Sequence, residues 1–199
     1  MKHKDIFCNK WYAFKDKLKL FENLVTPTVL YGSSTWTLTK DMERELKVAR
    51  RRMLRMMFGA RRRKITTMTE LAGPSGAFDT VETTEDAQLE PWTDWIKRTT
   101  YKVEELSAKM NAEDWVVSHR RKKWRFAGRT ARSSDSKWSL RLLTWTPVGT
   151  RSVGRPCRRW TDGFVALAGG DWIEHAGNDQ LWAALEDGFI HHELIAESL

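Results

Sequence analysis

The chain has 199 residues and 41% of them are hydrophobic, which is enough for one ordinary domain or two small ones with a modest core. Lysine and arginine number 34 against 26 aspartates and glutamates, and the formal net charge of +8 favours a polyanionic partner if the cations are clustered. With only Cys8 and Cys157, and without a long apolar run, the composition excludes a disulfide framework, a zinc ribbon and a membrane span. We expect a soluble, intracellular chain, in the nucleus or the cytoplasm.

Charge alternates along the chain in four blocks. Residues 1–72 carry 17 basic against 7 acidic residues, and residues 99–159 carry 15 against 5. Residues 73–98 have 2 basic and 6 acidic residues, while residues 160–199 have 8 acidic residues and no lysine or arginine. A single charge run is more often a solvated helix face, but two separate basic blocks favour a binding surface.

Two helices are predicted in the first basic block. Apolar residues recur at helical spacing over residues 9–24, and Pro27 should bend or interrupt this helix. A second helix is predicted from about Asp41 to Phe58, with Gly59 as its C-terminal cap. Its predicted core-facing stripe is Met42, Leu46, Ala49, Met53 and Met56. Basic residues occupy the other faces of this helix and continue into the run at 61–64.

The rest of the chain also favours helices. Residues 73–90 are predicted to form an acidic linker, and Pro91 is predicted to open a helix that ends near residue 110. Another helix is predicted from about Asn111 or Asp114 to Gly128, and short helices are predicted after a Gly/Pro/Arg loop at 144–162. The expected fold is mainly α, with a basic segment at 1–72, the linker at 73–90, and a C-terminal segment at 91–199 that ends in an acidic tail.

Clustered cations and one tryptophan are the candidate nucleic-acid contacts. In the segment 154–162 a glycine turn and a proline present three arginines beside Trp160, where guanidinium forks can bind phosphates and the indole can stack on a base. A structural cap in which Arg155 pairs with Asp162 explains the segment equally well. The full candidate set is Arg51, Arg52, Arg55, Arg61, Arg62, Arg63, Lys64, Arg120, Arg121, Lys122, Lys123, Arg155, Arg158, Arg159 and Trp160.

Other chemistry-bearing groups have simpler explanations. Most of the 11 tryptophans are expected in the core, because tryptophan at helical spacing is usually a packing residue. The pairs His191–His192 and Glu174–His175 are adjacent on helices and point to different faces, so no metal site is expected. No carboxylates lie at strand ends, where polymerase or nuclease metal ions would need them. We therefore predict no catalytic residue and no cofactor.

Several motifs resemble one family. The run Val25–Thr–Pro–Thr–Val–Leu–Tyr–Gly–Ser–Ser–Thr–Trp36, the helix that ends in Phe58–Gly59, the segment Trp124–Arg–Phe–Ala–Gly–Arg129, and Gly154–Arg–Pro–x–x–Arg–Trp160–x–Asp162 are similar to the region after the catalytic palm of non-LTR retrotransposon reverse transcriptases. Arg129 stands where the family usually has histidine. The aromatic–Ala–Asp–Asp polymerase signature and an apurinic-type endonuclease domain are absent. The resemblance implies a thumb-like and connector region that holds RNA and DNA.

The leading hypothesis is a nucleic-acid-binding C-terminal fragment of such a reverse transcriptase, which holds template-primer or element RNA through phosphate contacts. Whether it is an enzyme stays uncertain, because the parent family polymerises DNA but this chain lacks the catalytic motif. RNA, DNA or both are the expected partners, with little sequence specificity, and the oligomeric state does not follow from the sequence. The rival hypothesis is a relic or protein-interaction module whose acidic tail neutralises the basic blocks. A third is a pseudogene product that never folds.

Overall fold

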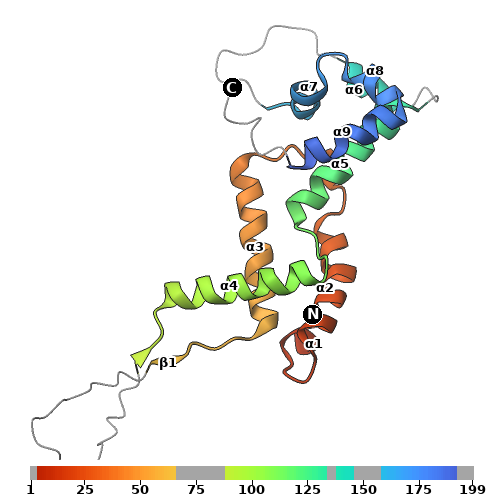
Figure 1. Cartoon of the computed structure of the whole chain (residues 1–199). Coiled ribbons are helices and arrows are strands. Elements are labelled where there is room, and N and C mark those ends of the chain that lie inside the picture. The colour runs from red at the N-terminus through yellow and green to blue at the C-terminus, as the bar shows by residue number, and fades with distance from the viewer. Residues whose placement is uncertain (1–3, 66–87, 134–137, 146–157, 192–199) are drawn as a thin grey trace, which may run out of the picture. The chain divides into compact units, whose positions relative to one another are not determined.

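The computed structural model describes residues 4–65, 88–133, 138–145 and 158–191, and these residues are mainly helical, which confirms the predicted fold class (Figure 1). The elements are α1 (Lys4–Cys8), α2 (Phe14–Val29), the short 3-10 helix η1 (Ser33–Thr35), α3 (Lys40–Phe58), β1 (Lys64–Ile65), β2 (Gln88–Leu89), α4 (Trp92–Lys109), α5 (Trp115–Ala131), α6 (Trp138–Thr144), α7 (Asp162–Ala168), α8 (Trp172–Gly177) and α9 (Asp179–His191). In this described part, no helix combines the length and the apolar character that crossing a membrane requires.

The chain forms two compact units that do not follow the order of the sequence. Unit 1 comprises residues 1–18 and 51–111, and unit 2 comprises residues 19–50 and 112–199. The division between them therefore falls within α2 and within α3. The predicted linker at 73–90 lies largely outside the described residues, so the predicted three-part organisation stays a prediction.

In unit 1 the C-terminal part of α3 contacts α4. Leu18, Leu54 and Val103 are almost completely buried, and the Lys17 ammonium donates a hydrogen bond to the carbonyl oxygen of Met57 at 3.1 Å. Strands β1 and β2 pair antiparallel, with Lys64 opposite Leu89. Figure 1 shows α4 crossing the C-terminal part of α3.

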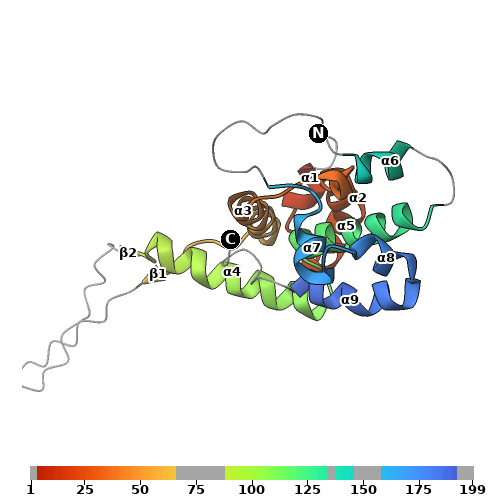
Figure 2. The ribbon, with the colours of Figure 1, turned by 90° about the horizontal axis from the view of Figure 1, so that it is seen from above.

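Unit 2 is built around α5. Its core cluster consists of Trp124, Ala127, Phe164, Ala168, Trp172, Ala176 and Trp182. These residues come from α5, α7, α8 and α9, and Figure 2 shows the last three helices gathered beside α5. Aromatic rings fill most of this core, which fits the expectation that tryptophans in this part of the chain are packing residues. Four other tryptophans are exposed in the structure, namely Trp11, Trp92, Trp138 and Trp145.

Two expected helix breaks do not occur. Pro27 lies inside α2, which continues to Val29, because it stands in the last turn and the hydrogen bond it removes belongs to the exposed Asn23. Gly128 lies inside α5, which continues to Ala131. This glycine is needed for a close approach, since a Cβ atom added there would lie 2.6 Å from the Trp182 ring. The predicted end at Gly59 is confirmed, with a φ of 66° after the last residue of α3.

The predicted core-facing stripe of α3 is wrong for three of its five residues, whereas Leu46 and Ala49 are half-buried. Met42, Met53 and Met56 are 49%, 40% and 60% exposed. The buried residues of this helix are Arg50, Leu54 and Met57, which lie on a neighbouring face about a quarter-turn away. In the unit 2 part of the helix, Arg50 turns inward because its guanidinium pairs with the Glu22 carboxylate at 3.0 Å. A buried ion pair can therefore override the apolar periodicity in determining which face of a helix is buried.

Candidate nucleic-acid interface

Helix α5 carries a row of exposed cations. The helix begins after Asp114, whose side chain accepts a hydrogen bond from the Val116 amide at 2.9 Å. Lys122, Arg125 and Arg129 are all exposed and stand three and four residues apart, so they lie on one face of the helix. The opposite face is anchored in the unit 2 core through Trp124 and Ala127, which fixes the direction in which this row points.

A tight turn lies beside this face. Gly32 has a φ of 65°, a left-handed conformation that suits glycine, and it leads from α2 into η1. Trp160 donates an indole hydrogen bond to the Ser34 carbonyl at 2.8 Å, and the Trp36 ring packs on His119 with centroids 6.1 Å apart. These contacts hold the turn and η1 against α5, although the two segments are about 90 residues apart in sequence.

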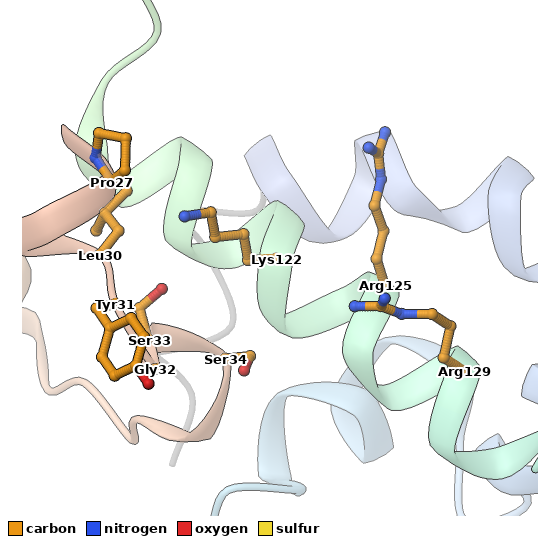
Figure 3. A pocket seen from close by; sticks show the side chains of 9 residues that line it. All are labelled: Pro27, Leu30, Tyr31, Gly32, Ser33, Ser34, Lys122, Arg125 and Arg129. Carbon is orange, nitrogen blue, oxygen red and sulfur yellow. The ribbon is translucent and has the colours of Figure 1, made fainter. Parts of the chain in front are cut away.

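The turn and the helix line an open pocket of about 370 Å³. Its wall on one side is Pro27 with residues 30–34, and its wall on the other side is Lys122, Arg125 and Arg129. In Figure 3 the Arg129 side chain extends toward the turn, whereas the Arg125 side chain points away from it. Arg125 is held by Glu186 of α9, with Nε to Oε1 at 2.9 Å.

The three cations of the row differ in how far other residues neutralise their charge. In the part of the chain that the structure describes, Lys122 and Arg129 make neither an ion pair nor a hydrogen bond. Arg125 is exposed over 62% of its side chain despite its bond to Glu186. The pocket is therefore lined by two unneutralised cations, Lys122 and Arg129, and by Arg125, which is partly neutralised and points away from the turn.

Two titratable groups are buried beneath this face. Burial, together with the neighbouring charges of Lys123 and Arg120, lowers the pKa of His119 to about 4, while a hydrogen bond with the backbone of Ser33 opposes this shift. Burial, together with Arg158, lowers the pKa of Lys123 to about 8, against the opposing effects of Asp162 and Glu43. The Lys123 ammonium lies 5.3 Å from the Trp160 ring centroid. Lys123 is thus part of the packing rather than of the exposed row.

The remaining predicted cations of α5 have protein partners. Arg120 donates to the Glu43 carboxylate at 2.6 Å and to the Ile190 carbonyl at 3.0 Å. Arg121 forms ion pairs with Glu113 and Glu186. Because their charges are already compensated, Arg120 and Arg121 are weaker candidates for phosphate contacts than Lys122.

The predicted cations in the unit 1 part of α3 form a dense group. Arg51 pairs with Glu104 at 2.7 Å, and Arg55 donates to the Thr100 hydroxyl at 2.9 Å. Burial and then the charges of Arg51 and Arg52 lower the pKa of Arg55. Arg52 is exposed and has no described partner, so this group retains unneutralised charge.

The basic run at 61–64 flanks the strand pair. Arg62 donates two hydrogen bonds to the Glu90 carbonyl, and the Arg63 amide donates to the Glu90 carboxylate at 3.2 Å. Hydrogen bonds from Arg98 lower the pKa of Glu90 to about 2, against the effect of burial, so this carboxylate stays ionised. The side chains of Lys64 and Arg61 have no described partner. The run is thus partly structural and partly free.

The second predicted arginine cluster is described only in part. Arg155 lies outside the described residues. Arg158 donates to the Leu38 carbonyl at 3.1 Å, and the Arg159 amide donates to the Asp162 carboxylate at 2.6 Å. Trp160 is half-buried and packs on Phe164 with centroids 4.9 Å apart. These contacts agree better with a structural role for Trp160 than with a base-stacking one.

Sequence reasoning missed two arginines and an aromatic residue of this site. Arg125 and Arg129 were outside the consecutive basic run on which the prediction depended, and Tyr31 was noted only within a motif. The spacing of Lys122, Arg125 and Arg129 around the buried Trp124 and Ala127 would have identified the row, because helical periodicity places them together.

In the described residues no group of three or more potential metal ligands comes together.

One curated relative links the chain to transposons. The chain is 24% identical over 149 residues to an uncharacterized transposon-derived protein of Caenorhabditis elegans. The match covers 74% of this chain and 42% of that protein. No family model and no solved structure matches the chain. The likeness supports a transposon origin.

Proposed function

We propose that this chain binds nucleic acid through its phosphates and that it derives from the region downstream of the polymerase core of a non-LTR retrotransposon reverse transcriptase. The observation that carries the proposal is the exposed row of Lys122, Arg125 and Arg129 beside a pocket on unit 2. The match to a transposon-derived protein supports the transposon origin that this proposal assumes. Cations on a rigid helix are suited to a phosphate backbone.

Binding of this kind is electrostatic and tolerant of sequence. Each phosphate that a lysine or arginine neutralises releases counterions, so the affinity falls as salt rises. Phosphate contacts are common to RNA and DNA and carry no base information. In an intact element, the surface would hold template-primer or element RNA, and this role involves no catalytic residue of this chain.

A second candidate function has its own support in the structure. Glu186 contacts both Arg125 and Arg121, and Asp179 pairs with Arg132 at 2.8 Å. Carboxylates of α9 therefore neutralise part of the basic face of α5, as a protein-interaction module with an internal acidic tail would require. They leave Lys122 and Arg129 unpaired, and for that reason we favour nucleic-acid binding.

The test is fluorescence anisotropy of the full chain with a labelled RNA hairpin and a labelled primer-template duplex. The slope of log affinity against log salt should be negative between about 50 and 300 mM salt, by about 0.7 to 0.9 for each phosphate contact. A Lys122→Ala/Arg125→Ala/Arg129→Ala variant should have a slope shallower by about two to three.

The matched control removes the same charge elsewhere. Lys15, Lys19 and Lys40 are exposed on helices α2 and α3 and have no described partner. Their triple alanine variant should keep most of the slope if the α5 row is the contact surface. Equal losses in the two variants would argue against a localised site, and absence of binding at the lowest salt would refute the proposed function.

A further inference from the structure

The pocket beside α5 combines charge with an exposed aromatic ring. Tyr31 is 86% exposed, and it lines the pocket together with Lys122 and Arg129. Exposed aromatic rings occur elsewhere in the chain, but Tyr31 is the one that lines this pocket beside cations without a described partner, where its face is free to stack on a ligand. Tyr31 precedes Gly32, whose φ of 65° begins the turn, and its side chain lies on the same side of the pocket as this turn.

The pocket is large enough for a small ligand. Its volume of about 370 Å³ is at the lower end of the range for small-molecule sites, and it can accommodate one nucleotide. Lys122 and Arg129 are seven residues apart on α5, which places their backbone positions about 10 Å apart along the helix axis. Their long side chains can converge on one phosphate from two sides.

We propose that this pocket holds one nucleotide of a single-stranded nucleic acid, with the base stacked on Tyr31 and its phosphate bound between Lys122 and Arg129. The inference rests on the proposed function and specifies the substrate class of the same site. Single-strand binding proteins combine cations that follow the backbone with aromatic rings that stack on bases. In a duplex the base faces are already stacked on one another, so Tyr31 would gain no partner there.

The ring can be removed without disturbing the fold, because Tyr31 is exposed. Tyr31→Ala should weaken binding of a single-stranded oligonucleotide by about 5- to 150-fold, which is the effect of losing one base-aromatic stack. Binding of a duplex of the same length should change less than about twofold. The salt slope should stay the same, because no charge is removed.

Two further variants separate stacking from other effects. Tyr31→Phe keeps the ring and should bind the single strand within about threefold of the native chain. Tyr101 is 72% exposed on α4 of unit 1, and Tyr101→Ala should leave single-strand affinity unchanged. Thermal unfolding of each variant checks that the fold is intact.

The experiment is anisotropy of the full chain with single-stranded RNA, single-stranded DNA of the same sequence, and their duplexes. The single-stranded RNA and DNA probes show which polymer the pocket accepts. If Tyr31→Ala weakens the binding of either single strand more than that of its duplex, the result supports the inference. An unchanged single-strand affinity, or an equal loss for single strand and duplex, would overturn it while leaving phosphate binding intact. Failure of the native chain to bind any of the probes would instead refute the proposed function.

Discussion

Trp124 and Trp182 hold each other through two reciprocal hydrogen bonds as well as through stacked rings. The Trp124 indole donates to the Trp182 carbonyl at 2.9 Å, and the Trp182 indole donates to the Trp124 carbonyl at 3.1 Å. Their ring centroids are 3.7 Å apart and the rings are within 5° of parallel. Both indole N–H groups are thereby satisfied inside the core, and α5 is fixed to α9 with its cationic face outward.

This arrangement predicts that Gly128→Ala destabilises the protein. A Cβ atom at position 128 would lie 2.6 Å from the Trp182 ring, and that ring cannot retreat because it is stacked on Trp124. We expect the free energy of unfolding to fall by about 1 to 3 kcal/mol, measured by chemical denaturation. The loss should occur although alanine has the higher helix propensity.

Gly188→Ala is the matched control within helix α9. A Cβ atom there would lie 3.7 Å from the Leu167 side chain, which is an ordinary contact distance. This variant should be unchanged or more stable by up to about 1 kcal/mol, because glycine in a helix interior carries an entropic penalty. If Gly128→Ala behaved like Gly188→Ala, the close approach to Trp182 would not limit stability.

Ion pairs at different depths should differ in their contribution to stability. Arg120 and Glu43 pair at 2.6 Å with side chains 18% and 17% exposed, and Arg120 also donates to a backbone carbonyl. Glu43→Gln should lower the free energy of unfolding by about 1 to 3 kcal/mol, since it leaves the guanidinium without its counter-charge. Asp41→Asn removes the partner of Arg44 in a pair whose side chains are 75% and 78% exposed. That change should cost less than about 1 kcal/mol, and equal losses would contradict the prediction.

His119 should make the stability of unit 2 dependent on pH. Its pKa is about 4 in the folded chain and 6.5 when unperturbed, so the unfolded chain binds the extra proton first as the pH falls. The contribution of neutral His119 is present in full above pH 6.5 and is lost as the pH falls through about 4. The free energy of unfolding should fall by up to about 3 kcal/mol more in the native chain than in His119→Gln over this window.

Denaturant titrations between about pH 4 and pH 7 measure this difference. The control is His191→Gln at the exposed end of α9, because it removes a histidine that is not buried. Parallel profiles for the native chain and His119→Gln would show that His119 does not carry the effect.

The sequence predicted the helical fold because most of its signals are local. Periodicity and the caps located α3, α4 and α5 to within a few residues, and Gly59 ended α3 as expected. Gly128 was misinterpreted because a glycine that ends a helix and one that admits a neighbouring ring look the same in sequence. The contact with Trp182 that distinguishes them joins residues 54 positions apart.

The candidate site was harder to predict because it depends on which cations are neutralised. Five of the predicted basic residues with described contacts, Arg51, Arg62, Arg120, Arg121 and Arg158, bond to carboxylates or carbonyls of the fold. A run of basic residues does not reveal such partners, because most of them come from distant segments. Lys122 has no described partner, and helical periodicity places Arg129, which also has none, on the same face of α5.

The carboxylates of α9 lead to a prediction about affinity. Glu186 is 16% exposed and contacts Arg125 at 2.9 Å and Arg121 at 3.4 Å, so it neutralises cations at the edge of the binding face. Glu186→Gln keeps the shape of this side chain and removes its charge. Arg125 should then be available to a phosphate, and the salt slope should become steeper by up to about 0.7 to 0.9.

The control is Asp187→Asn, which removes one exposed negative charge that has no described ion pair. It should strengthen binding only through the change in net charge, with a smaller effect on the slope. Deleting the whole acidic segment is unsuitable, since Phe164, Trp172 and Trp182 belong to the unit 2 core. A larger gain for Glu186→Gln than for Asp187→Asn would show that α9 restrains the cationic face, whereas equal gains would mean that only net charge matters. No gain in either variant would leave Lys122 and Arg129 as sufficient contacts and would argue against a neutralising role for this helix.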